Sequence, residues 1–358
     1  MPQLKGLATG IGSLPFSGAS ASDKALDLIF ECVPQIPFWP QLPKRDIHEG
    51  MTLQFSEKLP CLGLSGNDLV FHPENKDKEL EAFYEKIISQ DVDYFEISKS
   101  YALGLHEFSR RLKKDPEALK RIEFIKCHIT GPFTFAASLK DEKGIALLHD
   151  PVFMQAIIKG LAMKALWQIK FLKEFNKKII MFIDEPYLAA FGSAFTPVSR
   201  EEILAGLGEV SEKIKSEGQE LNSLDVLTGV HCCGNTDWSI LTDIKTIDII
   251  NFDAFGYLDK FIIYAPSLKD FLGRGGIICW GIVPTHELSD QETPDLLADK
   301  IQEGINALAK KGVGRDLVVE NLLLSPACGL GTLAPDESEK ILRLLSATSA
   351  LVRKNLPK

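Results

Sequence analysis

Short apolar runs alternate with longer amphipathic segments along most of the chain. The runs are rich in Ile, Val and Leu, and each is closely followed by Gly, Pro, Asp or Ser. This pattern is typical of parallel strands that are buried on both faces. It predicts eight strands, at Leu7–Ile11, Tyr94–Ile97, Phe124–Ile129, Ile179–Ile183, Val226–His231, Ile247–Phe252, Gly276–Trp280 and Asn321–Leu324.

The segments between these runs predict helices, because their apolar residues recur with the period of an α-helix. The helices are expected at Ser22–Val33, Lys76–Ser89, Pro151–Phe175, Ser199–Ser216, Pro294–Lys311 and Pro335–Arg353. Ser199 and Glu202 form a capping box, and Thr293 precedes a proline at a first helical position. The alternation favours an α/β fold of the (β/α)8 TIM-barrel class over a doubly wound sheet. We expect residues 1–358 to form one barrel domain.

A long, proline-rich segment interrupts this alternation at about residues 34–75, with Phe38, Trp39 and Pro40 near its start. It is too long for an ordinary connection between a strand and a helix. We therefore expect an excursion of the chain over the mouth of the barrel.

Composition excludes several classes of protein. Hydrophobic residues make up 45% and charged residues 25% of the chain, which fits a globular protein. The net charge of −9 argues against a nucleic-acid partner, which clustered Lys and Arg would attract. The N-terminus lacks the pattern of a secretory signal, and Lys159 and Lys164 interrupt the apolar stretch 156–167. We expect a soluble cytoplasmic protein with no membrane partner.

Residues able to do chemistry follow the predicted strands one after another. In a barrel of this class, active sites form where the strands end. The residues are Gly12 and Ser13 after the first strand, Thr130–Pro132 after the third, Asp184–Pro186 after the fourth, His231–Gly234 after the fifth, Asp253 after the sixth, His286 after the seventh and Cys328 after the eighth. Their convergence predicts a functional site at the mouth.

His231, Cys233 and Cys328 are candidate metal ligands. Side chains alternate along a strand, so His231 and Cys233 share one face and Cys232 takes the other. Glycines after Cys328 allow the backbone to turn sharply beside a ligand. One nitrogen and two sulfurs suit zinc best, and three protein ligands leave one position open. The chain has seven cysteines, and this odd number does not suggest a disulfide framework. Four others are expected to be buried core residues: Cys32, Cys61, Cys127 and Cys279.

Two interpretations of Asp253 remain open. It supplies a fourth, exchangeable ligand, or it orients His231 from behind. The use of the metal also has two readings, because zinc activates either a thiol or a water molecule. Two thiolate ligands reduce the Lewis acidity of the ion, so we favour activation of a thiol.

Five short motifs, taken in order, resemble the catalytic C-terminal half of cobalamin-independent methionine synthase. The residues around His231 also resemble the methylcobamide:coenzyme M methyltransferases, and both groups share the barrel superfamily of uroporphyrinogen decarboxylase. The resemblance spans nearly the whole chain. The motifs are Ile11–Pro15, Gly131–Thr134, Ile183–Pro186, His231 with Cys233, and Pro326–Leu330.

The resemblance implies a role for each of these residues. It implies zinc held by His231, Cys233 and Cys328, with a carboxylate in the fourth place that falls on Asp253 after a Glu-to-Asp change. It further implies homocysteine binding by Ser13 and Asp184, assistance from Glu185, and a general acid at His286. The alternatives are purely structural roles: a helix cap for Ser13, a loop-bracing carboxylate for Asp184 and a surface position for His286.

Two departures from the family bear on the methyl donor. The enzyme that uses methylfolate has a second, N-terminal barrel, which this sequence lacks. It also has a tryptophan four residues beyond the Gly-Pro-x-Thr motif, and here that position is Ser138. A flat pterin therefore loses a stacking partner. This favours a methylated corrinoid, free or on a carrier protein, as the donor.

The sequence therefore predicts a zinc-dependent methyltransferase of methionine biosynthesis that moves a methyl group from a corrinoid to homocysteine or a similar small thiol. One alternative is a decarboxylase of the uroporphyrinogen type, which needs several basic residues for its carboxylates. Lys44 and Arg45 are the only basic pair expected near the mouth. The other alternative is a non-enzymatic barrel that handles zinc or a corrinoid.

Overall fold

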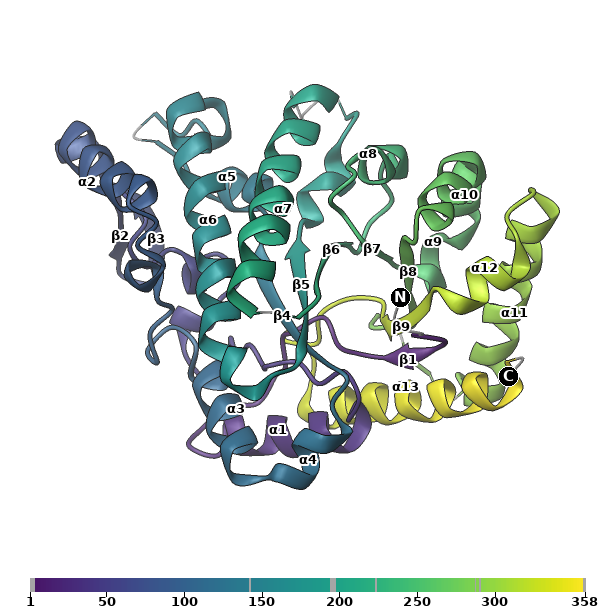
Figure 1. Ribbon diagram of the computed structural model, residues 1–358. Coiled ribbons are helices and arrows are strands. Elements are labelled where there is room, and N and C mark those ends of the chain that lie inside the picture. Colours follow the sequence, from purple (N-terminus) through teal and green to yellow (C-terminus); the bar gives the residue numbers. More distant parts are fainter. Residues whose placement is uncertain are drawn as a thin grey trace.

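The computed structural model describes residues 4–356 apart from 142, 194–197, 223, 287 and 290. Within this part of the chain, a parallel sheet of seven strands runs in the order β1, β9, β8, β7, β6, β5, β4, with helices around it (Figure 1). The strands are β1 Leu7–Ala8, β4 Phe124–Thr130, β5 Lys178–Asp184, β6 Val226–Cys232, β7 Ile249–Phe252, β8 Ile277–Val283 and β9 Leu322–Pro326. They confirm seven of the expected strands.

All the helices expected from periodicity are present. They are α1 Ala21–Cys32, α2 Lys76–Ile88, α6 Pro151–Leu172, α7 Arg200–Asn222, α11 Pro294–Lys310 and α13 Pro335–Asn355. Both start signals are confirmed: Ser199 and Glu202 exchange hydrogen bonds, and the Thr293 side chain accepts one from the amide of Leu296. Other helices were not expected: α3 Leu103–Lys114, α4 Pro116–Arg121, α5 Pro132–Ser138, α8 Trp238–Asp243, α9 Ala254–Phe261, α10 Ala265–Gly273 and α12 Arg315–Glu320.

Alternate residues of each strand belong to two separate apolar clusters. On β5, Ile179, Met181 and Ile183 pack between the sheet and the helices, whereas Ile180 and Phe182 belong to a cluster inside the sheet's curl. The inner cluster also contains Leu4, Leu7, Ile36, Phe124, Ile249, Ile277, Cys279 and Leu323. Both edge strands, β1 and β4, contribute to it, so the sheet curls into a half-barrel.

The strand expected at Tyr94–Ile97 is wrong. Residues Val92–Phe95 form the 3-10 helix η4, because the Asp91 side chain accepts the amide of Tyr94 and turns the chain. Phe95 and Ile97 are fully buried. Apolar residues are needed for this burial, and they made the segment resemble a strand.

Residues 35–41 lie beside both edges of the sheet instead. The amide of Lys126 on β4 donates to the carbonyl of Pro37 at 2.9 Å, and the amide of Gln41 donates to that of Gly12 at 3.0 Å. Phe38 also bridges to Lys126, and Ser13 to Gln41. The described chain therefore shows a sheet of seven strands, with an irregular segment between its edges.

The rest of the excursion at residues 34–75 contains two 3-10 helices, η1 Ile47–Glu49 and η2 Leu53–Phe55, and an antiparallel hairpin of β2 Leu62–Ser65 and β3 Asp68–Phe71. The hairpin and α2 extend to the left edge of Figure 1. The hydroxyl of Thr130, at the end of β4, donates to the carbonyl of Met51 at 2.6 Å. This contact ties the excursion to the strand ends.

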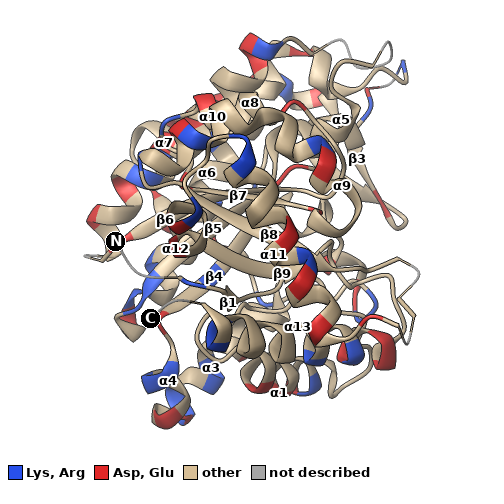
Figure 2. Cartoon of the chain, turned by 90° about the vertical axis from the view of Figure 1, so that its right-hand side faces the viewer, with Lys and Arg blue, Asp and Glu red and all other residues tan. Residues whose placement is uncertain are grey.

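Figure 2 shows blue and red segments interspersed over the outer helices, while the strands at the centre are largely tan. Oppositely charged side chains pair there, as Arg111 does with Asp27. Among the described residues, every helix falls short of the combined length and apolar character that a membrane crossing requires.

Candidate metal centre

Three soft ligands meet where β6 and β9 end. His231 lies near the end of β6, Cys233 follows that strand, and Cys328 is the second residue after β9. One ligand atom from each lies within 4.8 Å of the other two. Two strands separate β6 from β9 in the sheet, so the curl brings these side chains together. The Cys232 side chain is buried in the core outside the curl, as alternation predicts.

A buried amide orients the His231 ring. The Nδ1 atom of His231 lies 2.5 Å from Oδ1 of Asn251 on β7. The Nδ2 atom of Asn251 donates to the carbonyl of Cys279 and to the hydroxyl of Ser325, at 2.9 and 2.8 Å. These contacts turn the amide oxygen toward the ring, so Nδ1 carries the proton. The Nε2 atom is then free to face the sulfurs, as a zinc ligand must.

Electrostatics in the cluster favour a deprotonated sulfur. Hydrogen bonds from Cys328 and His231 lower the pKa of the Cys233 thiol below its ordinary value. Burial opposes a positive charge on His231, but the Cys233 sulfur and the charge of Asp184 outweigh it and raise the pKa of the ring. Metal ligation requires cysteine in its thiolate form. The donor set, its spacing and the oriented imidazole therefore fit zinc.

Asp184 ends β5 beside this cluster. Its side chain is only 9% exposed, and its Oδ1 atom has no hydrogen-bond partner in the described chain. Burial raises the pKa of this carboxyl group, and the positive charge of Lys126 partly offsets the rise. An unpaired, buried carboxylate oxygen is ready to accept a hydrogen bond from a ligand.

Lys126 was missed by the sequence reasoning. It is fully buried on β4, where its Nζ donates to the carbonyl of Ile11 and lies 4.7 Å from the centre of the Phe182 ring. Burial lowers the pKa of this lysine to about 8. A lysine inside an otherwise apolar strand was the signal that could have revealed it.

Glu185 forms hydrogen bonds with the start of α5, the helix that follows β4. Its carboxylate accepts the amides of Phe133 and Thr134, at 3.0 and 2.6 Å, and the hydroxyl of Thr134. Burial raises the pKa of Glu185 to about 7. The residue thus anchors the start of α5, and it is not among the described residues that line the cavity beside the metal ligands.

Ser13 joins two loops at the mouth. Its hydroxyl accepts the amide of Gly331 at 3.1 Å, and its carbonyl accepts the amide of Leu330. It therefore braces the loop that carries Cys328, and it caps no helix, since α1 begins at Ala21. The fit is tight, because a Cβ atom on Gly329 would lie 2.5 Å from the Ser13 hydroxyl oxygen.

Asp253 lies outside the group of three ligands. It caps α9, since its Oδ1 atom accepts the amide of Gly256 at 2.8 Å. Asn251, two residues earlier and on β7, makes the hydrogen bond to His231 that one interpretation gave to Asp253. His286 is exposed, and its ring borders the cavity.

The metal ligands lie at the wall of a cavity of about 490 Å³. Ser13, Asp184 and His286 border it together with the three ligands, so the structure brings most of the predicted site residues together. Gln41, Pro43 and Met51 of the excursion also line it, as does Thr285, which the sequence reasoning missed. A metal ion held by these three ligands would keep one coordination position open toward a small ligand.

Among the described residues, no Lys or Arg lines this cavity. Lys44 donates to the carbonyls of Thr332 and Leu333, and Arg45 pairs with Glu49 at 2.8 Å. Both members of the basic pair are therefore already engaged, Lys44 with carbonyls of two residues that border the cavity.

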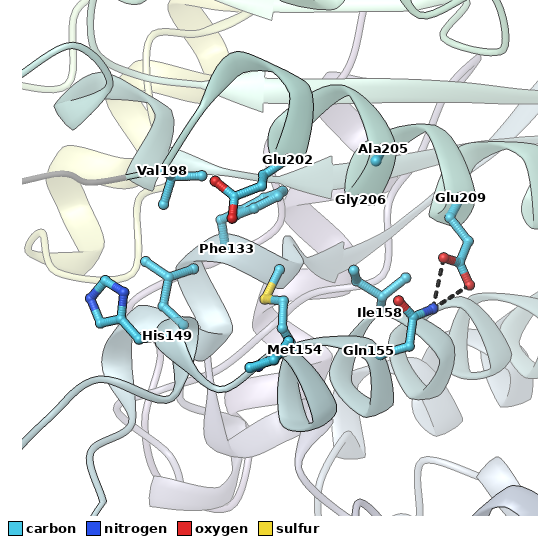
Figure 3. Close-up of a pocket in the computed structure, with 12 residues that line it drawn as sticks. Phe133, His149, Met154, Gln155, Ile158, Val198, Glu202, Ala205, Gly206 and Glu209 are labelled. Atoms are coloured by element: carbon cyan, nitrogen blue, oxygen red, sulfur yellow. Dashed lines mark hydrogen bonds between the residues drawn. The ribbon is translucent and has the colours of Figure 1, made fainter.

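A second cavity of about 450 Å³ lies between α6 and α7. In Figure 3, Met154 and Ile158 lie on its α6 side and Glu202 on its α7 side, while Gln155 donates to both carboxylate oxygens of Glu209. It contains none of the predicted site residues.

No protein-family model matches the chain. The chain is similar to a methionine synthase of Methanocaldococcus jannaschii, with 24% identity over 231 residues. The match covers 63% of this chain and 65% of that relative. The chain thus spans just under two thirds of the length of the curated relative that it matches.

Proposed function

We propose that this chain is a zinc-dependent methyltransferase that moves a methyl group from a methylated corrinoid to a small thiol such as homocysteine. The observation that carries the proposal is the meeting of His231, Cys233 and Cys328 at the wall of a cavity large enough for a small ligand. Similarity to a methionine synthase supports a methyltransferase. We further propose a (β/α)8 barrel in which residues 35–41 take the place of the second strand.

His231, Cys233 and Cys328 would hold the zinc ion, and Asn251 would keep the imidazole aimed at it. Bound zinc would lower the pKa of a thiol in its open position enough for that thiol to lose its proton near neutral pH. The sulfur's electron pair would form the new bond to the methyl carbon, and the electron pair of the breaking bond would stay on the donor. His286, which is exposed and borders the cavity, would pass the released proton to solvent.

The charge of the cavity favours an acceptor that bears an ammonium group. Asp184 offers an unpaired carboxylate oxygen, and no Lys or Arg is among the described lining residues. An ammonium would pair with Asp184, whereas the sulfonate of coenzyme M would be repelled by it. Homocysteine therefore suits the site better than coenzyme M. Ser13 would shape the acceptor's end of the cavity by holding the loop of Cys328 in place.

A neighbouring groove offers an approach for the methyl donor. A hollow of about 540 Å³ lies between the excursion and α5, and it shares Met51 with the metal cavity. Leu53, Leu69 and Leu139 line it, as does Ser138. Polar residues, among them Asn67, Asp68 and Lys140, complete the lining. The leucines would contact the face of a macrocycle, while the serine provides no aromatic platform for a pterin. We therefore favour a corrinoid, free or on a carrier protein.

The test combines a metal assay with a matrix of substrates. Purified protein is analysed for zinc, then offered methylcobalamin or methyltetrahydrofolate, each with homocysteine or coenzyme M. We expect bound zinc, and methionine from the pair methylcobalamin and homocysteine. Protein that binds no zinc, or that forms no thioether with any pair, would overturn the proposal. Loss of the cobalt-bound methyl group without added thiol would instead favour a corrinoid-handling protein.

A further inference from the structure

Thr285 places a buried hydroxyl at the wall of the metal cavity. The residue follows β8 and is 2% exposed, and its Oγ1 atom has no hydrogen-bond partner among residues 4–356 as described. Buried hydroxyl groups in folded proteins are nearly always paired, because an unpaired one loses its hydration without compensation. The described part of the chain therefore leaves this hydroxyl without a partner.

Other polar side chains of this cavity are engaged with the protein. The Ser13 hydroxyl accepts the amide of Gly331, Gln41 donates to Gln54 at 2.8 Å, and Nδ1 of His231 pairs with Asn251. In the described part of the lining, Thr285 Oγ1 and Asp184 Oδ1 are the buried oxygens without a partner. Two residues of the cavity wall thus each carry a buried, unpaired oxygen, and the two oxygens differ in chemistry.

The two oxygens select complementary groups on a ligand. An ionised carboxylate only accepts hydrogen bonds, so Asp184 requires a donor such as an ammonium. A hydroxyl can donate, and in a cavity without a described Lys or Arg it is a suitable neutral donor for a ligand's carboxylate. An amino acid carries both groups.

We propose that Thr285 is a specificity-determining residue, which donates a hydrogen bond to the carboxylate of a thiol-bearing amino acid whose ammonium lies against Asp184. The inference rests on the proposed function and deepens it, since it names the acceptor class as an α-amino acid with a terminal thiol. Thr285 holds the acceptor but takes no part in bond making.

The test compares Thr285→Val with Thr285→Ser in the zinc-loaded protein. The valine variant keeps the shape and loses the hydroxyl, so the KM for homocysteine should rise about tenfold while kcat changes little, which corresponds to about 1.4 kcal/mol of binding free energy. The serine variant should restore the KM. Valine should not lower the unfolding midpoint, because the hydroxyl it removes makes no bond within the described chain.

Truncated acceptors locate the contact. 3-Amino-1-propanethiol lacks the carboxylate, so its KM should be the same for wild type and Thr285→Val. 4-Mercaptobutyrate keeps the carboxylate, so Thr285→Val should raise its KM by the same factor as the KM for homocysteine. Thr348→Val is the matched control: it breaks a buried hydrogen bond to the Leu344 carbonyl in α13, so it should lower stability and leave the KM unchanged.

An unchanged KM for homocysteine in Thr285→Val, or an equal loss with 3-amino-1-propanethiol, would overturn the inference. If the wild type transfers no methyl group, the proposed function fails on its own. Calorimetric binding of homocysteine to the zinc-loaded wild type and to Thr285→Val still decides the role of Thr285 in that case. Equal affinities would count against it, and weaker binding by the variant would support it.

Discussion

Asn251 decides which nitrogen of His231 faces the sulfurs, because its amide can present an oxygen to the ring only while its nitrogen donates to Cys279 and Ser325. We expect Asn251→Ala to lower zinc affinity about 10- to 100-fold, as is usual when the group behind a metal-bound histidine is lost. Competition with a chromogenic chelator measures this. Asn251→Asp keeps an acceptor oxygen, so its zinc affinity should fall less than that of the alanine variant. Equal affinity in the alanine variant would show that the ring needs no such support.

The two neighbouring cysteines of β6 provide a direct test of the ligand assignment. Cys328→Ala and Cys233→Ala each remove a sulfur from the group of three, so both should purify with far less zinc than the wild type. Cys232→Ala is the matched control, because that sulfur is buried on the opposite face and lies 3.5 Å from the carbonyl of Gly234. Elemental analysis gives the zinc content. Zinc loss in the Cys232 variant alone would mean that the wrong cysteine had been assigned.

Alternation along a strand made part of this site predictable. It placed His231 and Cys233 on one face and Cys232 on the other, as the structure confirms. The same rule separates Asp184 from Glu185, which are adjacent, so that only Asp184 reaches the cavity. Asn251 and Thr285 could not be found in this way. Their roles depend on the register between strands and on burial, which no single segment encodes.

Gly281 lets β8 and β9 approach each other beside Cys328. The register between these strands shifts at this point, and a Cβ atom on Gly281 would lie 2.7 Å from the Phe252 carbonyl oxygen and 2.8 Å from the Cα atom of Ala327. We expect Gly281→Ala to cost about 1–3 kcal/mol of unfolding free energy and to weaken zinc binding, because backbone must move. Urea denaturation and a zinc titration measure the two effects.

Gly208→Ala is the control for that variant. Gly208 lies in α7, and a Cβ atom there meets no other atom within 4 Å. The substitution should raise the unfolding free energy by up to about 1 kcal/mol, because alanine favours a helix. Equal stability of the two variants would remove the argument for crowding at the β8–β9 junction.

Glu185 should make the anchoring of α5 depend on pH. Burial raises the pKa of this carboxyl from 4.5 to about 7, so the folded protein holds the proton more tightly than the unfolded chain does. Its contribution to stability is then fully present below pH 4.5 and is lost as pH rises through about 7. Relative to Glu185→Gln, the unfolding free energy of the wild type should fall by about 3 kcal/mol as the pH rises through this range.

Unfolding free energies of the two proteins at several pH values test this. Glu202→Gln provides a control of opposite sign, because hydrogen bonds to Ser199 lower the pKa of Glu202 and its contribution is lost as pH falls. A difference between wild type and Glu185→Gln that stays constant from pH 4.5 to 8 would show that folding does not raise the pKa of Glu185.

Elements with a clear period were predictable, and irregular ones were not. The β4 to β9 strands and the long helices follow from apolar periodicity alone. Residues 35–41 carry two prolines and make only single bridges to each side, so they have no strand pattern, although they lie between the sheet's edges. Residues 94–97 have the composition of a strand but owe their burial to helix packing. In both cases tertiary contacts override the local pattern.

At the scale of the whole molecule, the metal ligands connect parts of the sheet that hydrogen bonds do not connect directly. Cys328 lies on the loop after β9, which Ser13 ties to the loop after β1, while His231 lies on β6 and Cys233 directly follows it. An ion held by all three would therefore link the two halves of the curl. Because such a site does not exist in the unfolded chain, binding of a metal would add to the stability of the fold.

Removal of the metal should therefore destabilise the protein as a whole. With free zinc about 1,000-fold above its dissociation constant, binding would contribute about 4 kcal/mol, so a chelator should lower the wild-type unfolding midpoint by several degrees. Added zinc should restore it. Cys328→Ala should start near the chelated value and respond to neither treatment, because its folded state offers the ion one sulfur fewer. A wild-type midpoint that ignores the chelator, measured after complete zinc removal is verified, would mean that the ligands meet without holding the two halves together.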